Sequence, residues 1–178
     1  MIRTKRLAAL AALAVTAGFT VGVATAVEQG DRAPAWQAQD FSGRTVEFPA
    51  LLEGKPTVTV FWATWCPYCK AFMPYLKEIQ ADYGADRINV LTIDAKEDGS
   101  GDPAAYVASL GMPMIAVADG DAIAAAYDVE YIPGLFVIAP DGTVAYRRPW
   151  TDLPAGDRVA SFWSRQVRQV LDRMLAEE

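Results

Sequence analysis

Cys66 and Cys69 are the two cysteines of the chain and the residues best suited to carry chemistry. They stand three positions apart, where an apolar run typical of a strand gives way to a helical pattern. At a helix N-terminus, unpaired backbone N–H groups and the helix dipole lower the pKa of a thiol below its free value of about 8.5. Cys69, one turn further on, can reach Cys66 while the helix covers it. The spacing predicts a reversible switch in which Cys66 forms a mixed disulfide with a substrate and Cys69 resolves it.

The neighbours of the two cysteines fit this interpretation. Pro67 suits the first turn of a helix, where its missing N–H is not needed. We expect Tyr68 to be exposed and to contact substrate, and Trp65 to lie at the rim of the site rather than in the core. A purely structural disulfide is a weaker alternative, because closing so small a loop constrains little of the unfolded chain.

The absence of histidine excludes much other chemistry. With no histidine among its 178 residues, the chain cannot use a Ser-His-Asp or Cys-His mechanism or bind a metal or haem through imidazole. A zinc site needs four ligands, which two cysteines cannot supply without carboxylates or a second chain. We therefore expect no metal and no cofactor other than the redox-active disulfide Cys66–Cys69.

The first 26 residues read as a secretory signal peptide. Arg3, Lys5 and Arg6 form a basic start, residues 7–23 are largely apolar, and Ala24-Thr25-Ala26 is a small-x-small cleavage site. An uncleaved N-terminal anchor is the alternative, because the apolar stretch is long enough to span a bilayer. Both interpretations place the rest of the chain outside the cytoplasm, in the periplasm or an equivalent compartment.

Residues 27–178 are expected to form one domain, because no repeat, low-complexity stretch or long linker divides them. Three of the 16 Lys and Arg residues and none of the 22 Asp and Glu residues precede this part, so it carries a net charge of about -9. Such acidity argues against a nucleic-acid partner.

The periodicity of the chain predicts a mixed sheet between helices, an α/β fold. The last helix has the clearest pattern, an apolar stripe that we expect to face the core. Strands are expected at residues 36–41 and 44–48, which form a hairpin, and at 57–63, 88–94, 114–118, 135–139 and 143–148; helices are expected at 67–83, 103–110, 121–127 and 159–175. Asp102 and Asp121 are the expected N-caps of the two middle helices, and Pro74 is expected to kink the first.

The segment FWATWCPYCK, residues 61–70, together with Pro74, resembles the active-site segment of the thioredoxin superfamily. The wider frame is similar to TlpA/ResA-type thiol-disulfide oxidoreductases: it includes GDRAPAW, GKPTVTVFWATWC, an insertion between Asp94 and Tyr127, and AYDVEYIPGLFVIAPDGTV at residues 126–144. This resemblance covers nearly all of residues 30–175. It implies a thioredoxin fold with an N-terminal hairpin and an insertion before a cis proline.

The resemblance assigns the cis proline to Pro133. A cis Ile132–Pro133 bond would present the backbone of Ile132 to an extended substrate. Gly134-Leu135 departs from the hydroxyl-bearing pair common after this proline, which puts the usual substrate contacts in doubt.

The acid that assists the resolving thiol is also not in its usual place. Thioredoxins carry a buried acid at the position of Val60, and TlpA/ResA-type proteins often carry a Glu near the position of Ala95. Asp94 and Glu97 are the candidate acid/base residues, although we expect them to be solvated loop charges.

The resemblance implies a reductase of protein disulfides, kept reduced by a membrane electron donor and acting, for example, on the haem-binding cysteines of apocytochromes c. Two alternatives stay open. One is a DsbA-like thiol oxidase, although such oxidases usually carry a larger helical insertion. The other is a redox-inert thioredoxin-fold binding protein, which burial of both sulfurs would support. A peroxiredoxin-type peroxidase is weaker, because no threonine and arginine stand at recognisable spacing around Cys66.

Overall fold

The computed structural model describes residues 26–150 and 157–176. The signal peptide or anchor expected at residues 1–26 lies, but for its last residue, outside this part. The elements in chain order are β1 Trp36–Gln39, β2 Thr45–Phe48, the 3-10 turn η1 Ala50–Leu52, β3 Thr57–Trp62, α1 Pro67–Tyr83, β4 Asn89–Asp94, α2 Pro103–Leu110, β5 Ile115–Val117, α3 Asp121–Ala126, β6 Gly134–Ile138, β7 Val144–Arg147 and α4 Asp157–Ala176.

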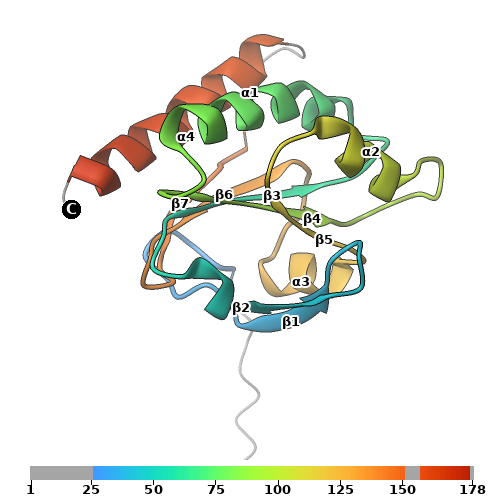
Figure 1. The fold of residues 1–178 in the computed structure, drawn as a ribbon, viewed down its shortest axis with the longest axis horizontal. Helices are drawn as coiled ribbons and strands as arrows, with labels where there is room; N and C mark the ends of the chain where they lie inside the picture. Colours follow the sequence, from blue (N-terminus) through green and yellow to red (C-terminus); the bar gives the residue numbers. More distant parts are fainter. Residues whose placement is uncertain (1–25, 151–156, 177–178) are drawn as a thin grey trace, which may run out of the picture.

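A five-stranded sheet in the order β5-β4-β3-β6-β7 forms the centre of the fold (Figure 1). Strands β3, β4 and β5 run parallel, whereas β6 and β7 pair antiparallel to their neighbours. All six residues of β3 are buried, as expected for the apolar run that precedes the cysteines. The mixed sheet predicted from the sequence is confirmed.

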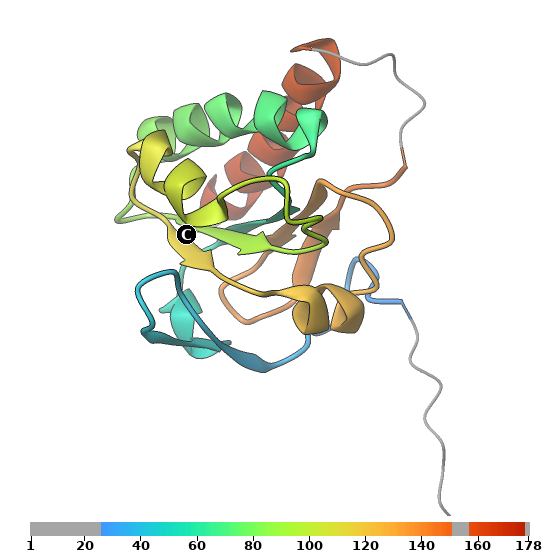
Figure 2. The same ribbon diagram turned by 90° about the vertical axis from the view of Figure 1, so that its right-hand side faces the viewer.

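Helices cover both faces of this sheet. Helices α1, α2 and α4 lie on one face, and α3 with the separate β1–β2 hairpin lies on the other; Figure 2 shows the two layers from the side. Each face has its own apolar core: Val60, Trp62 and the two cysteines belong to the α1/α4 core, and Phe61 belongs to the opposite one. Cys66 and Cys69 therefore lie on the face of the sheet that α1 and α4 cover.

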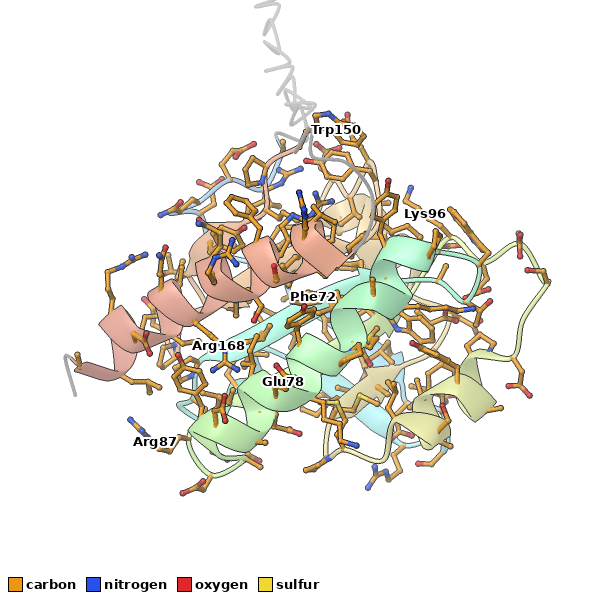
Figure 3. All side chains as sticks on the ribbon, turned by 90° about the horizontal axis from the view of Figure 1, so that it is seen from above. Phe72, Glu78, Arg87, Lys96, Trp150 and Arg168 are labelled. Atoms are coloured by element: carbon orange, nitrogen blue, oxygen red, sulfur yellow. A yellow bond between two sulfur atoms is a disulfide. The ribbon has the colours of Figure 1, made fainter. Side chains whose placement is uncertain are left out.

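Helix α4 closes the α1 side through its apolar stripe. Val159, Trp163, Val167 and Leu171 are all buried, which confirms the core-facing orientation expected from the sequence. Figure 3 shows Phe72 between α1 and α4, where its ring meets that of Trp163 edge-on at a centroid distance of 6.2 Å.

The helix boundaries agree with the sequence except at one cap. The Asp102 carboxylate caps α2 by accepting from the Ala105 N–H at 2.9 Å, as expected. The cap expected at Asp121 is wrong, because Gly120 is the N-cap of α3 and makes no side-chain cap bond. The Asp121 carboxylate instead accepts from the backbone N–H of Lys96, so it holds a different loop. Helix α1 continues through Pro74. None of the helices in the described part of the chain has the length and apolarity needed to cross a bilayer.

Candidate active site

Cys66 is the N-cap of α1 and is joined to Cys69 by a disulfide, with a Cα–Cα distance of 5.3 Å. Its Sγ accepts a hydrogen bond from the backbone N–H of Cys69 at 3.1 Å. Pro67 occupies the first helical turn. A charge on Cys66 Sγ would therefore meet a backbone donor and the positive end of the helix dipole, both of which stabilise a thiolate.

The surface around the disulfide is aromatic, and both cysteines lie beneath it. Cys66 is 1% exposed and Cys69 is fully buried, whereas Trp65 and Tyr68 are 44% and 37% exposed. Trp65 and Tyr68 are both exposed, as expected; their contact with substrate stays a prediction. The indole N–H of Trp65 donates to the carbonyl of Lys96 at 2.6 Å, which ties the rim to the loop after β4.

The Ile132–Pro133 bond is cis, as the resemblance implied. Because Gly134 pairs with Phe61 across β3 and β6, Pro133 lies beside the end of β3 that leads to Cys66. Gly134 is required by packing: a Cβ there would lie 2.7 Å from Cγ1 of Val129 and 3.2 Å from Cβ of Phe61. The departure from the usual hydroxyl-bearing residue therefore has a steric cause in this chain.

Asp94 is a buried acid on the cysteine side of the sheet. It pairs with Trp62 in the parallel ladder, so its side chain lies on the α1 face. Asp94 is 5% exposed, and its Oδ1 has no hydrogen-bond partner within the described residues. Burial first, and then the neighbouring Glu97 carboxyl, raises the pKa of Asp94 from 3.8 to about 7. The expectation of a solvated charge is wrong for Asp94, because the pairing with Trp62 turns the carboxyl at the end of the predicted strand inward.

Glu97 is half-buried rather than fully solvated, and it supports the approach to Cys66. Its two carboxylate oxygens accept from the backbone N–H and, at 2.5 Å, from the hydroxyl of Thr64. Thr64 lies two residues before Cys66, so Glu97 fixes the turn between β3 and α1. Asp94 and Glu97 are thus neighbouring carboxyls. Asp94 is buried and its Oδ1 has no hydrogen-bond partner among the described residues, whereas Glu97 is half-buried and bonded to Thr64.

Arg148 is a site residue that the sequence analysis missed. It follows β7, is 5% exposed, and donates from Nε and Nη2 to the carbonyl of Pro133 at 2.9 and 2.7 Å. Desolvation lowers the pKa of its guanidinium below the ordinary value. Strand alternation is the one signal that could have found it, because Arg148 stands two positions after the buried Tyr146.

A thioredoxin-like sheet, a CxxC pair capping a helix and a cis proline beside it define a thiol-disulfide oxidoreductase of the thioredoxin superfamily. The AhpC/TSA family model matches residues 29–147, and the chain belongs to this family. Among curated relatives, ResA of Bacillus thuringiensis (strain Al Hakam), a thiol-disulfide oxidoreductase, is 32% identical over 118 residues, 65% of this chain and 66% of the relative. DsbE of Yersinia pestis, a thiol:disulfide interchange protein, is 30% identical over 142 residues, 78% of this chain and 70% of the relative.

Solved structures agree with this assignment. A secreted disulfide oxidoreductase of Mycobacterium tuberculosis is 25% identical, with a TM-score of 0.56 over 74% of this chain and 95% of that one. A DsbE protein of Chlorobium tepidum has a TM-score of 0.67 at 22% identity, covering 82% and 99% of the two chains, and shows the fold alone. The TlpA/ResA-type resemblance is confirmed. The match to the ResA proteins spans just under two thirds of their length.

Proposed function

We propose that the protein is an extracytoplasmic thiol-disulfide oxidoreductase that reduces protein disulfides through Cys66 and Cys69. The observation that carries this proposal is the position of Cys66 at the N-cap of α1, bonded to Cys69 beside the cis proline. The relatives named as thiol-disulfide oxidoreductases support the same chemistry.

The reaction begins with the reduced protein. The Cys66 thiolate attacks a substrate disulfide, the substrate S–S bond breaks, and one substrate sulfur leaves as a thiolate. Cys69 then loses its proton and attacks Cys66 Sγ in the mixed disulfide. The second substrate sulfur leaves, so the substrate has gained two electrons and Cys66–Cys69 is oxidised. A dithiol donor at the membrane returns the two electrons.

Asp94 is the group that we assign to the proton of Cys69. It lies on the cysteine side of the sheet, is buried, and has a pKa of about 7, so it exchanges a proton near neutral pH. Glu97 serves Asp94 by raising its pKa and by holding the turn at Thr64. Trp65, Pro67, Tyr68 and the Ile132 backbone are the proposed substrate contacts.

We also propose that the protein is exported and that its substrates are exported proteins. Residues 1–26 act as a signal peptide or anchor, and residues 27–178 work outside the cytoplasm. Haem-binding cysteines of apocytochromes c are the client class that the family resemblance favours.

The burial of both cysteines favours a second candidate, the redox-inert binding protein. Equilibrating the purified protein with defined glutathione buffers separates the candidates, with Cys69→Ser as a control that cannot form the internal disulfide. A potential near about -270 mV supports the reductase, and one near about -120 mV an oxidase. Failure to detect any reversible Cys66–Cys69 couple would leave the binding protein as the better reading.

A further inference from the structure

Arg148 places a guanidinium inside the fold, next to the cis proline. Burying a charge is costly unless hydrogen bonds satisfy it. Here Nε and Nη2 converge on one acceptor, the Pro133 carbonyl, at 2.9 and 2.7 Å. The backbone N–H of Arg148 also donates to the carbonyl of Leu135 at 2.8 Å. Both the side chain and the main chain of Arg148 thus hold the segment that contains the cis bond.

Two aromatic rings flank the same guanidinium. Its Cζ lies 4.7 Å from the ring centroid of Tyr131 and 4.6 Å from that of Trp163. Cation–π contacts of this kind are strongest where water is excluded. The Tyr131 hydroxyl also donates to the Arg148 carbonyl at 3.4 Å. Arg148 therefore joins the segment before β6 to helix α4.

The contact chain continues to the CxxC helix. The Trp163 ring lies 6.5 Å from that of Tyr68, which stands between the two cysteines, and 6.2 Å from that of Phe72, one turn into α1. Phe72 is seen between the two helices in Figure 3. Arg148, bonded to the Pro133 carbonyl, and Trp163, packed on Tyr68 and Phe72, thus link the cis-proline segment to the N-terminal end of α1.

We propose that Arg148 is a positioning residue that fixes the Ile132–Pro133 segment relative to the CxxC helix, so that an extended substrate chain can dock on the Ile132 backbone while Cys66 attacks its disulfide. This inference rests on the proposed function. It concerns the docking of a polypeptide and not the reactivity of the thiol. A disulfide that carries no polypeptide should therefore not depend on Arg148.

The test compares two probes with the same leaving group. One is a linear peptide whose single cysteine is disulfide-bonded to thionitrobenzoate; the other is the small symmetrical disulfide of thionitrobenzoate. In each case the Cys66 thiolate of the reduced protein attacks, and thionitrobenzoate leaves with the electron pair and is measured by absorbance. Arg148→Met is compared with Arg148→Lys, which keeps the charge and one donor to the carbonyl.

We expect Arg148→Met to lower the rate constant for the peptide by about 10²-fold, the size of effect that a misplacement of about 1 Å produces. The rate constant for the small disulfide should stay unchanged, and Arg148→Lys should recover part of the loss. Arg147→Met is the matched control, because the neighbouring Arg147 contacts Glu28, the Val27 carbonyl and Asp128 but, within the described residues, makes no hydrogen bond to the cis proline. It should leave both rate constants unchanged.

Equal losses with both probes would overturn the inference, since Arg148 would then act on the thiol or on the whole fold. So would an Arg148→Met protein that reacts with the peptide at the wild-type rate. If Arg148→Met does not fold, Arg148→Lys decides the matter by the same comparison. A wild-type protein that releases no thionitrobenzoate from either probe would refute the proposed function itself, and the inference with it.

Discussion

Replacing Asp94 by Asn should stabilise the oxidised protein by an amount that grows as the pH rises from 4 to 7. The pKa of Asp94 is raised from 3.8 to about 7 in the folded protein, chiefly by burial. Within that interval the carboxyl is protonated when folded and ionised when unfolded. The unfolded state then binds fewer protons, so the wild type loses stability as the pH rises. Asn carries no proton to lose, so the variant escapes this loss.

The size of the effect follows from the two pKa values. Each pH unit between them is worth about 1.4 kcal/mol, which gives an upper bound of about 4 kcal/mol. Asp94 is 5% exposed but lies at the end of its strand beside the half-buried Glu97. Solvent near this end therefore reduces the free-energy cost of ionising the Asp94 carboxyl. We therefore expect the stability difference between variant and wild type to widen by about 2 kcal/mol from pH 4 to pH 8.

Urea unfolding followed by tryptophan fluorescence at pH 4, 6 and 8 measures this difference. The new amide group does not titrate, so any change in stability that it causes is the same at every pH. It therefore does not affect how the difference between variant and wild type changes with pH. Asp98→Asn is an internal control of opposite sign: hydrogen bonds from Ser100 lower the pKa of Asp98, so its contribution to stability is present at neutral pH and lost on acidification. A gap between D94N and wild type that is flat with pH, or that narrows as the pH rises, would refute the reasoning.

Two further substitutions test the packing around the site. Gly134→Ser should destabilise the protein by about 1–3 kcal/mol in thermal unfolding, because the new Cβ would lie 2.7 Å from Val129 and 3.2 Å from Phe61. Adding Val129→Ala to this variant should recover part of the loss. An unchanged Tm for Gly134→Ser alone would contradict the steric argument. Asp82→Asn should cost less than about 0.5 kcal/mol, because Asp82, which pairs with Arg168 at 2.6 Å, has a largely exposed side chain; a loss of several kcal/mol would contradict this argument.

The fold was largely predictable because its signals are local. The apolar run at β3 and the stripe of α4 bury the faces that their periodicity indicates. Asp102 caps its helix as its position suggests. Asp121 stands at an equally typical position, yet its carboxylate is taken by the Lys96 N–H. A cap is decided by which donor lies nearest, and that depends on tertiary contacts.

The chemistry of the site was predictable for a similar reason. Cys66 and Cys69 are close in sequence, and their strand-to-helix setting can be read from the residues around them. The cis bond at Pro133 came from family resemblance alone, since nothing local distinguishes that proline from a trans turn proline. Asp94 was expected to end a strand, but its burial was missed because the face it takes depends on the pairing with Trp62, which lies far away in the sequence.

Arg147 and Arg148 show most clearly where sequence reasoning stops. They are adjacent and chemically identical, yet Arg147 forms an ion pair with Glu28 at 3.2 Å while Arg148 is buried against the Pro133 carbonyl. Alternation along β7 separates the two by face but does not say which face will hold a charge. The buried face can hold the guanidinium of Arg148 because the Pro133 carbonyl accepts its hydrogen bonds there. The rings of Tyr131 and Trp163 flank the same guanidinium. Arg148 therefore connects the cis proline to Trp163 of α4, and Trp163 in turn packs on the CxxC helix, a link that tertiary contacts create.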